Sequence, residues 1–165
     1  MSSDDSTSAA FDTKQFRNAL GAFPTGVTVI TTCDAQGNHY GVTASSFNSV
    51  SLEPPLVLWS IGKSSTSYEA FMDAENWNVH VLATDQVGVS GNFARSGGDK
   101  FGDVTCTNGL AGVPVIDGCA AVFQCLTEHR YEGGDHIIMV GRVIEYSQED
   151  KQPLVFHNGA YSALV

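Results

Sequence analysis

The feature that most limits the fold of this chain is a succession of short apolar segments, rich in β-branched residues and separated by turns. Such segments are typical of strands, which we expect over residues 27–32, 40–44, 56–61, 77–83, 120–128, 136–146 and 154–156. The connections, such as the turn at 34–38, are mostly of hairpin length, whereas parallel strands need much longer crossovers. The predicted fold class is therefore mainly β with short helices, an antiparallel barrel or sandwich.

A first helix is predicted before the first strand. Asp12 is placed as its N-cap, Gln15 occupies the capping-box position, and Pro24 ends it. One side of this helix is apolar, with side chains at the i, i+3, i+4 and i+7 positions contributed by Phe16, Ala19, Leu20 and Phe23.

Two more short helices are expected among the strands. Thr66 and Glu69 have the spacing of a second capping box, and a third helix is expected over 86–94, although its glycines weaken it. Residues 96–118 hold several glycines, and we expect a long loop there with little regular structure.

The length of 165 residues fits one domain, which we place at 12–165 after a polar, disordered tail at 1–11. The first residues have neither the basic nor the apolar region of a signal peptide, and no apolar run approaches the ~20 residues of a membrane helix. We therefore expect a cytoplasmic protein with no membrane partner. The four cysteines match no zinc pattern, so we expect reduced thiols and no metal.

The charge balance is acidic, with 8 Lys and Arg against 18 Asp and Glu and a net charge of -10. Nucleic acids and anionic membranes bind clustered cations, so neither is expected as a partner. A local cationic pocket for a small anion remains compatible with this balance, and Lys63, Arg95 and Lys100 are the candidate cations.

Two stretches are dense in hydroxyl groups. Residues 41–51 combine small and hydroxylated side chains that suit the close approach of a flat ring or a phosphate, or simply form a polar strand face. Residues 60–67 place Lys63 among hydroxyls before a helix, which indicates either an anion site or ordinary helix capping.

Two further stretches carry chemistry-bearing side chains. Arg95, in the segment 92–95, either grips a phosphate or is solvated. The turn at 133–136 exposes the imidazole of His136, either for a ligand or incidentally, and its proximity to His129 supports no defined metal site. The chain lacks a nucleophile elbow and the glycine-rich phosphate loops, which argues against a hydrolase, a Rossmann fold and a P-loop protein.

Taken together, these stretches resemble the short-chain flavin reductase family. The resemblance is carried, in the family's order, by residues 16–31, 41–56, 60–63, 92–94, 134–136 and 153–161, and it covers about 12–165. It implies an FMN-binding split β-barrel, usually a homodimer. Such proteins are typically the reductase components of two-component flavin monooxygenases, so the resemblance also implies a partner monooxygenase that receives reduced flavin.

The resemblance also implies a role for individual residues. Those expected to bind the flavin are Gly41, Thr43, Ala44, Ser45, Ser46, Ser60, Lys63, Ser64, Ser65, Asn92, Phe93, Ala94 and Arg95. Those expected to meet NADH or NADPH are Ala22, Phe23, Pro24, Thr25 and His136. The choice between FMN and FAD, and between the two nicotinamide nucleotides, stays open.

The implied reaction is hydride transfer from a nicotinamide nucleotide to a flavin, so the predicted enzyme is an NAD(P)H-dependent flavin reductase. The reacting atoms belong to the two nucleotides, so the reaction requires no acid, base or nucleophile from the protein. His136 is expected to orient the nicotinamide nucleotide. The alternatives are a non-enzymatic flavin-binding redox sensor or carrier and, third, a related split-barrel oxidase with its own organic substrate.

Overall fold

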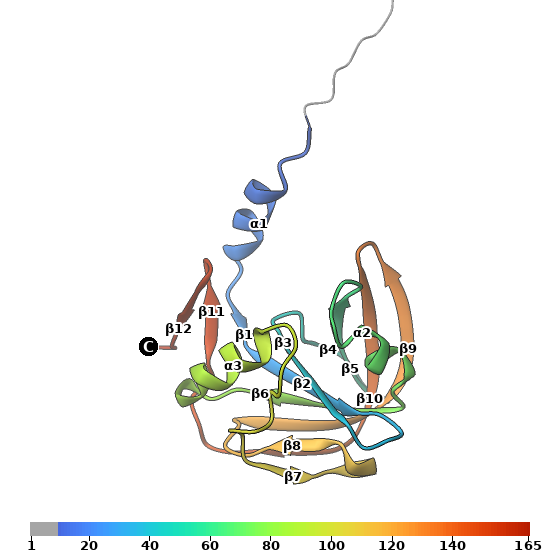
Figure 1. The fold of residues 1–165 in the computed structure, drawn as a ribbon. Helices are drawn as coiled ribbons and strands as arrows, with labels where there is room; N and C mark the ends of the chain where they lie inside the picture. Colours follow the sequence, from blue (N-terminus) through green and yellow to red (C-terminus); the bar gives the residue numbers. More distant parts are fainter. Residues whose placement is uncertain (1–9) are drawn as a thin grey trace, which may run out of the picture.

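The computed structural model describes residues 10–165, so most of the predicted 1–11 tail lies outside the described residues. Its centre is a seven-stranded antiparallel sheet in the order β3-β2-β6-β9-β10-β5-β4 (Figure 1). The strands are β2 (Thr28–Cys33), β3 (His39–Ala44), β4 (Asn48–Leu52), β5 (Pro55–Gly62), β6 (Asn76–Val81), β9 (Ala121–Gly133) and β10 (His136–Gln148). The mainly β, antiparallel class predicted from the hairpin-length connections is confirmed.

The sheet curls until its two ends approach each other. Just beyond β3, Ser46 Oγ accepts a hydrogen bond of 2.9 Å from the backbone N–H of Ser60 on β5. Within residues 10–165 no strand ladder joins these two ends, and β3 and β4 stay the edges of the sheet. The gap between them is the place where side chains, rather than backbone pairs, line the interior.

Two smaller sheets and the helices surround this sheet. One small sheet has the order β1-β11-β12 and the other pairs β7 with β8. Their bounds are β1 (Thr25–Gly26), β7 (Cys106–Asn108), β8 (Pro114–Ile116), β11 (Val155–His157) and β12 (Ala160–Ser162). The helices are α1 (Thr13–Gly21), α2 (Tyr68–Asp73) and α3 (Val87–Ala94), with 3-10 turns η1 (Thr84–Gln86) and η2 (Leu110–Gly112).

Two local predictions were wrong. The capping box at Thr66 is absent, because α2 begins at Tyr68 with Ser67 as its N-cap and no side-chain capping bond. The stretch 96–118 is not a featureless loop, because β7 and β8 pair with each other inside it. By contrast, the predicted N-cap of α1 is confirmed, since Asp12 Oδ1 accepts hydrogen bonds of 2.9 and 3.1 Å from two backbone N–H groups of the first turn.

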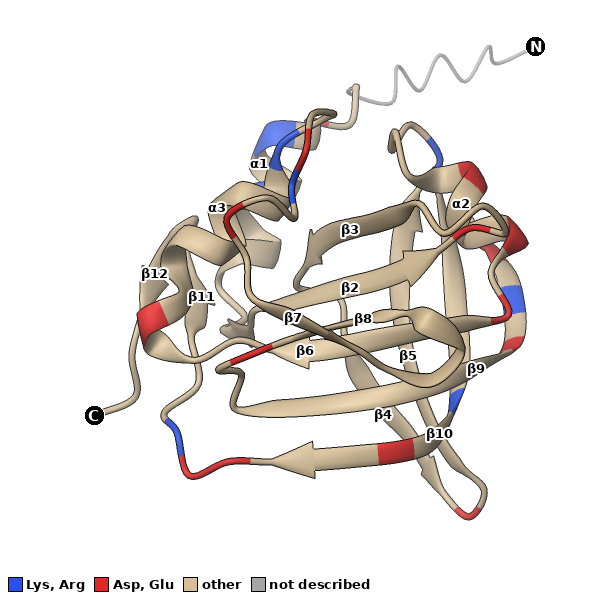
Figure 2. Ribbon diagram, turned by 60° about the horizontal axis from the view of Figure 1, so that its bottom comes forward, with Lys and Arg blue, Asp and Glu red and all other residues tan. Residues whose placement is uncertain are grey.

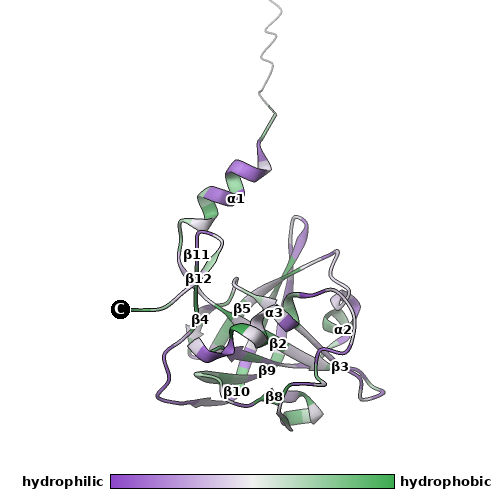
Figure 3. Ribbon diagram, turned by 60° about the vertical axis from the view of Figure 1, so that its left-hand side comes forward, coloured by the Kyte–Doolittle hydropathy of each residue, from purple (hydrophilic) through white to green (hydrophobic). Residues whose placement is uncertain are grey.

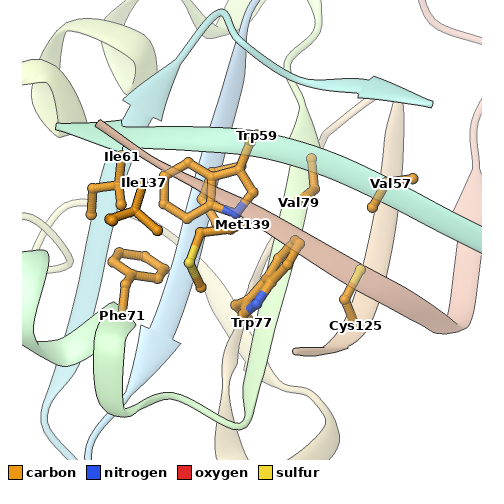
Figure 4. Packing of buried hydrophobic residues seen from close by; sticks show 10 residues of the cluster. Val57, Trp59, Ile61, Phe71, Trp77, Val79, Cys125, Ile137 and Met139 are labelled. Carbon is orange, nitrogen blue, oxygen red and sulfur yellow. The ribbon is translucent and has the colours of Figure 1, made fainter. Parts of the chain in front are cut away.

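An aromatic core joins α2 to the sheet. Phe71 of α2 meets Trp59 of β5 edge-on at 4.9 Å between ring centroids, and Trp77 of β6 meets Trp59 at 6.0 Å (Figure 4). Gly141 of β10 makes room for this packing, because a Cβ there would lie 2.5 Å from the Trp77 ring. Such aromatic contacts add to the free energy gained by burial and fix the relative positions of β5, β6 and α2.

The helix α1 projects away from the sheets and buries none of its residues (Figure 1, Figure 3). The helix ends at Gly21, so Phe23 of the predicted apolar face lies beyond it, and Phe16, Leu20 and Phe23 are exposed to 49%, 58% and 76%. Acidic residues are scattered over many elements (Figure 2). In the part of the chain that the structure describes, no helix has the length and apolar character needed to cross a membrane.

Candidate functional site

A cavity of about 360 Å³, called the main cavity below, opens where the two ends of the curled sheet approach each other. Its wall comes from β3 and its exit, from the second half of β5, from the end of α3 and from His136 at the start of β10. The volume lies in the range of small-molecule sites. The lining residues are Val42, Thr43, Ala44, Ser45, Ser46, Trp59, Ser60, Ile61, Gly62, Ser65, Thr66, Phe93, Ala94, Arg95, Ser96, Lys100 and His136.

The hydroxyl groups of this wall are oriented by backbone partners. Thr43 Oγ1 donates its proton to the carbonyl of Ser90 in α3 at 2.6 Å, so toward the cavity this hydroxyl can only accept a hydrogen bond. Ser46 Oγ is held between the N–H and the carbonyl of Ser60. Ser45, next to it, is exposed and makes no hydrogen bond within residues 10–165 that would compete with a ligand.

A buried cation forms part of the main cavity. Lys100 is only 8% exposed, and its Nζ donates to the carbonyls of Gly41 at 3.0 Å and Phe93 at 3.3 Å. Burial, with a smaller contribution from the nearby Arg95, lowers the pKa of this ammonium group. Among the described residues no carboxylate forms an ion pair with it. An ammonium has three N–H donors, so one remains for an anion in the cavity.

Arg95 lines the same cavity, and its guanidinium is oriented by a hydrogen bond to Asn92. Its guanidinium donates to the side-chain oxygen of Asn92, whose amide donates in turn to the backbone carbonyl of Lys100. Asn92 does not itself line the main cavity and instead ties the end of α3 to the Lys100 loop. The structure thus brings two cations, Arg95 and Lys100, to one wall.

Three other residues predicted to touch the flavin lie away from this lining. Lys63 forms an ion pair of 2.6 Å with Glu132, which raises the pKa of its ammonium, and neither Lys63 nor Ser64 lines the main cavity. Gly41 is buried behind the wall, where a Cβ would lie 2.6 Å from the ring of Phe93. Glycine is therefore required at this position because a side chain would collide with the ring of Phe93. The sequence pattern had instead indicated that a ligand approaches the backbone here.

His136 stands at the rim of the main cavity. Its side chain is about half exposed, and Nδ1 lies 2.7 Å from a carboxylate oxygen of Asp135. The hydrogen bond with His136 lowers the pKa of the Asp135 carboxyl group. The Asp135 backbone is tied down as well, since its carbonyl accepts from the N–H of Lys63 at 2.9 Å. The imidazole is therefore oriented by a neighbour, while its Nε2 makes no hydrogen bond within residues 10–165.

A second cavity of about 520 Å³ adjoins the first, and Ser45 lines both. Its wall comes from α1, β1 and the β11–β12 hairpin, through Arg17, Asn18, Leu20, Gly21, Phe23, Thr25, Ser45, Phe156, Asn158 and Gly159. Of the four consecutive residues predicted to meet the nicotinamide nucleotide, Phe23 and Thr25 line this cavity, whereas Ala22 and Pro24 do not. Thr25 Oγ1 is buried with no hydrogen-bond partner within residues 10–165.

The sequence interpretation missed several lining residues. Trp59, Thr66 and Ser96 each adjoin a predicted site residue, and extending each motif by one residue would have found them. All four cysteines are free thiols. Between residues 10 and 165, no group of three His, Cys, Asp or Glu side chains is arranged to hold a metal ion.

Comparison with known proteins places this geometry in a family. The chain is 46% identical to FMN reductase (NADH) SmoA of Agrobacterium fabrum over 150 residues, covering 91% of this chain and 85% of that protein. It is 41% identical to the reductase component of the flavin-dependent trigonelline monooxygenase of Acinetobacter baylyi, covering 90% of this chain but only 48% of that longer protein.

A solved structure agrees over nearly the whole chain. It is the NADH:FAD oxidoreductase SgcE6 of Streptomyces globisporus C-1027, in complex with NAD and FAD fragments, and it matches with a TM-score of 0.89 and 36% identity over 93% of each chain. The flavin reductase like domain family matches residues 20–164, which include every residue that lines the main cavity. The chain therefore belongs to the flavin reductase like domain family.

Proposed function

We propose that this protein is an NAD(P)H:flavin oxidoreductase that passes a hydride from a nicotinamide nucleotide to FMN or FAD and supplies the reduced flavin to a partner monooxygenase. The observation that carries the proposal is the pair of adjoining cavities that meet at Ser45, one of them walled by hydroxyls and two cations. Two cavities with a shared wall suit two substrates that must touch.

The residues around the main cavity fit a flavin phosphate ester. Lys100 is a buried ammonium with no carboxylate partner among the described residues, and such a charge is costly unless an anion or polar ligand offsets it. Arg95 adds a second cation, and the hydroxyls of Ser65 and Thr66 add neutral donors. Lys63 is not among the proposed phosphate-binding residues because its ammonium forms an ion pair with Glu132.

The two nucleotides supply the redox chemistry when both are bound, by direct transfer of a hydride from nicotinamide C4 to flavin N5. The protein's contribution is to hold them in contact and to exclude water. Stacking at a near-attack distance of about 3–3.5 Å removes much of the entropic part of the barrier. In this proposal Thr43, Ser45, Ser46 and Ser60 position the flavin, while Phe23, Thr25 and His136 position the nicotinamide nucleotide.

Two residues named by the family resemblance act indirectly in this proposal. Gly41 admits the ring of Phe93 to the cavity wall, and Asn92 holds the guanidinium of Arg95. They are positioning residues, since neither lines either of the two cavities. Their replacement is expected to change flavin affinity through Phe93 and Arg95.

A homodimer is part of the proposal. The apolar side chains of Phe16 and Leu20 on α1 and of Phe23 just after it are mostly exposed within residues 10–165, and such an apolar surface is costly in water. A second copy of this chain would cover it. We also propose a cytoplasmic location, which is compatible with the four free thiols.

A steady-state assay tests the function. Purified protein is mixed with FMN, FAD or riboflavin and with NADH or NADPH, and nucleotide oxidation is followed by its near-ultraviolet absorbance. We expect oxidation that depends on protein and flavin together, and faster with a phosphorylated flavin than with riboflavin. Flavin binding without oxidation of either nucleotide would contradict the proposal and favour the alternative of a flavin carrier or redox sensor.

A further inference from the structure

The two cavities are joined by a chain of side-chain contacts that the hydride transfer itself does not require. Thr43, on the wall of the main cavity, donates to the carbonyl of Ser90 at 2.6 Å. Ser90 lies inside α3, is 1% exposed, and its own hydroxyl meets the hydroxyl of Tyr161 at 2.8 Å. The ring of Tyr161 packs edge-on against Phe156, on the wall of the second cavity, at 5.5 Å between centroids.

The β11–β12 hairpin that carries Tyr161 lines the second cavity and contacts α3, whose end lines the main cavity. At its turn, the N–H of Asn158 donates to the carbonyl of Gly21 at the end of α1 at 2.9 Å, and both residues line the second cavity. On its other strand, Tyr161 reaches α3, whose last residues Phe93 and Ala94 line the main cavity. These contacts connect the wall of the second cavity to α3 and, through α3, to the wall of the main cavity.

Besides the packing of Phe156 against the core cluster that includes Val29, and a hydrogen bond of 2.8 Å from the N–H of Leu154 to the carbonyl of Leu82, the hairpin is held by a small sheet. It pairs with β1 in its own three-stranded sheet, and the ladder of β1 with β11 is only two residues long. A short ladder resists displacement less than the long ladders of β9 and β10, because each paired residue adds to the free energy that holds a strand in place. Among the described residues, the bond between the Ser90 and Tyr161 hydroxyls is the only side-chain hydrogen bond that the β11–β12 hairpin makes.

We propose that Tyr161 is a positioning residue that couples the two cavities, so that a nicotinamide nucleotide in the second cavity changes the affinity of the main cavity for flavin. The inference rests on the proposed function, because it takes the two ligands from there. By linkage the coupling is reciprocal, and typical coupling free energies correspond to affinity changes of about 5- to 150-fold. Through this coupling the protein would bind flavin tightly when the hydride donor is present. It would release the reduced flavin once the donor has left.

The test measures the dissociation constant of FMN by quenching of its fluorescence, with and without saturating NAD⁺, which binds but donates no hydride. In the unmodified protein we expect NAD⁺ to change the FMN dissociation constant about fivefold or more. In Tyr161→Phe, which keeps the ring but removes the hydroxyl, we expect that factor to fall toward one. Tyr146→Phe is the matched control, since Tyr146 is 73% exposed and its hydroxyl makes no hydrogen bond within residues 10–165, and it should keep the full factor.

A double-variant cycle separates coupling from a general loss of structure. Ser90→Ala removes the same hydroxyl pair from the α3 side and keeps the carbonyl that accepts from Thr43. If the pair carries the coupling, the double variant should show the same reduced factor as either single variant. An undiminished NAD⁺ effect in Tyr161→Phe, or no NAD⁺ effect in the unmodified protein, would overturn the inference. A protein that binds no flavin at all would instead contradict the proposed function.

Discussion

Lys100 is a charged side chain held almost fully inside the protein. Its Nζ donates hydrogen bonds to two backbone carbonyls, which carry no charge and so do not neutralise the ammonium. Because burial lowers the pKa of the ammonium, an anion in the main cavity would restore the preference for the charged form. The residue is therefore best explained as half of an ion pair whose other half is a ligand.

Replacement of Lys100 should distinguish phosphorylated from unphosphorylated flavin. In Lys100→Met we expect FMN affinity to fall about 10- to 100-fold, the size of a hydrogen bond to a charged group, while riboflavin affinity changes little. Fluorescence titration with both flavins measures the ratio. Lys63→Met is the control, because that lysine is paired with Glu132 outside the main cavity. An unchanged FMN-to-riboflavin ratio in Lys100→Met would rule out this role.

His136 should matter for the nucleotide rather than the flavin. In His136→Ala we expect the KM for NADH to rise about 2- to 10-fold, as for loss of one hydrogen bond, with FMN affinity unchanged. His129→Ala is a suitable control, since His129 is an exposed imidazole on the adjoining strand that lines neither cavity. If both variants keep the original KM for NADH, His136 does not orient the nucleotide.

The site could be predicted from the sequence as far as local motifs reach. The motif residues Thr43 to Ser46, Ser60 and Arg95 do gather around one cavity, because each lies at the end of an element that meets the gap in the sheet. What the sequence could not supply is long-range packing. The burial of Lys100, the seating of Phe93 over Gly41 and the capture of Lys63 by Glu132 all join residues far apart in the chain.

At the scale of elements, α1 is amphipathic, and within residues 10–165 only its end contacts another element, the β11–β12 hairpin, while none of its residues is buried. Its N-terminus is well capped by Asp12, yet an isolated helix of 9 residues is only marginally stable in water. A second copy of the chain would supply the missing contacts and stabilise both helices.

A charge placed on the apolar side of α1 should therefore dissociate the protein. We expect Leu20→Asp to convert a dimer into monomers, and Lys14→Asp, on the opposite side of the helix, to leave the dimer intact. Light scattering after gel filtration gives the mass in solution. A monomeric unmodified protein, or a dimeric Leu20→Asp variant, would contradict the proposed dimer.

The hairpin of β7 and β8 is fixed to the large sheet through a buried histidine. His80 of β6 is fully buried, with Nδ1 2.9 Å from the carbonyl of Val29, and Nε2 accepts from the N–H of Ile116 at 3.0 Å. This pattern requires the neutral imidazole with its proton on Nδ1. Burial lowers the pKa of His80 from 6.5 to about 4.

The free energy of unfolding should consequently depend on pH through His80. Because its pKa is lower in the folded state, the unfolded state binds more protons between pH 6.5 and about 4, and stability falls as the pH drops through that window. The full loss is about 3 kcal/mol. Urea unfolding across this range measures it, and His80→Gln should show a flatter dependence. Equal pH slopes in the two proteins would disprove the assignment.

The sequence patterns missed several strands that are short or exposed and are recognised only by their backbone hydrogen bonds to a neighbouring strand. The strand β4 is mostly exposed, so it lacks the buried apolar residues that mark β2, β5 and β6. The strands β7, β8 and β12 have three residues each, too short for a period to show, and unlike the equally short β11, which overlaps the apolar run at 154–156, they overlap no run of three apolar residues uninterrupted by proline. By contrast, strands were predicted over 120–128 and 136–146, within β9 and β10, because both segments carry many apolar and β-branched residues, although β9 runs on to Gly133.

On the scale of the whole molecule, the net charge of -10 and the proposed anionic substrates are compatible because the positive charge is local. Of the eight Lys and Arg residues, two line the main cavity, and Arg17 lines the second. Several of the others are paired with surface carboxylates. The acidic exterior disfavours nucleic acids and other polyanions, while the cavities retain cations that can bind small phosphate esters.

The central claim is that the two adjoining cavities bring a nicotinamide nucleotide and a flavin into contact for direct hydride transfer. The most direct test is an anaerobic single turnover, in which protein, FMN and NADH are mixed rapidly and the visible flavin absorbance is followed. We predict bleaching that requires the protein and is slower with NADH deuterated at the transferred C4 position. Bleaching no faster than in the absence of protein, or none at all, would contradict the claim.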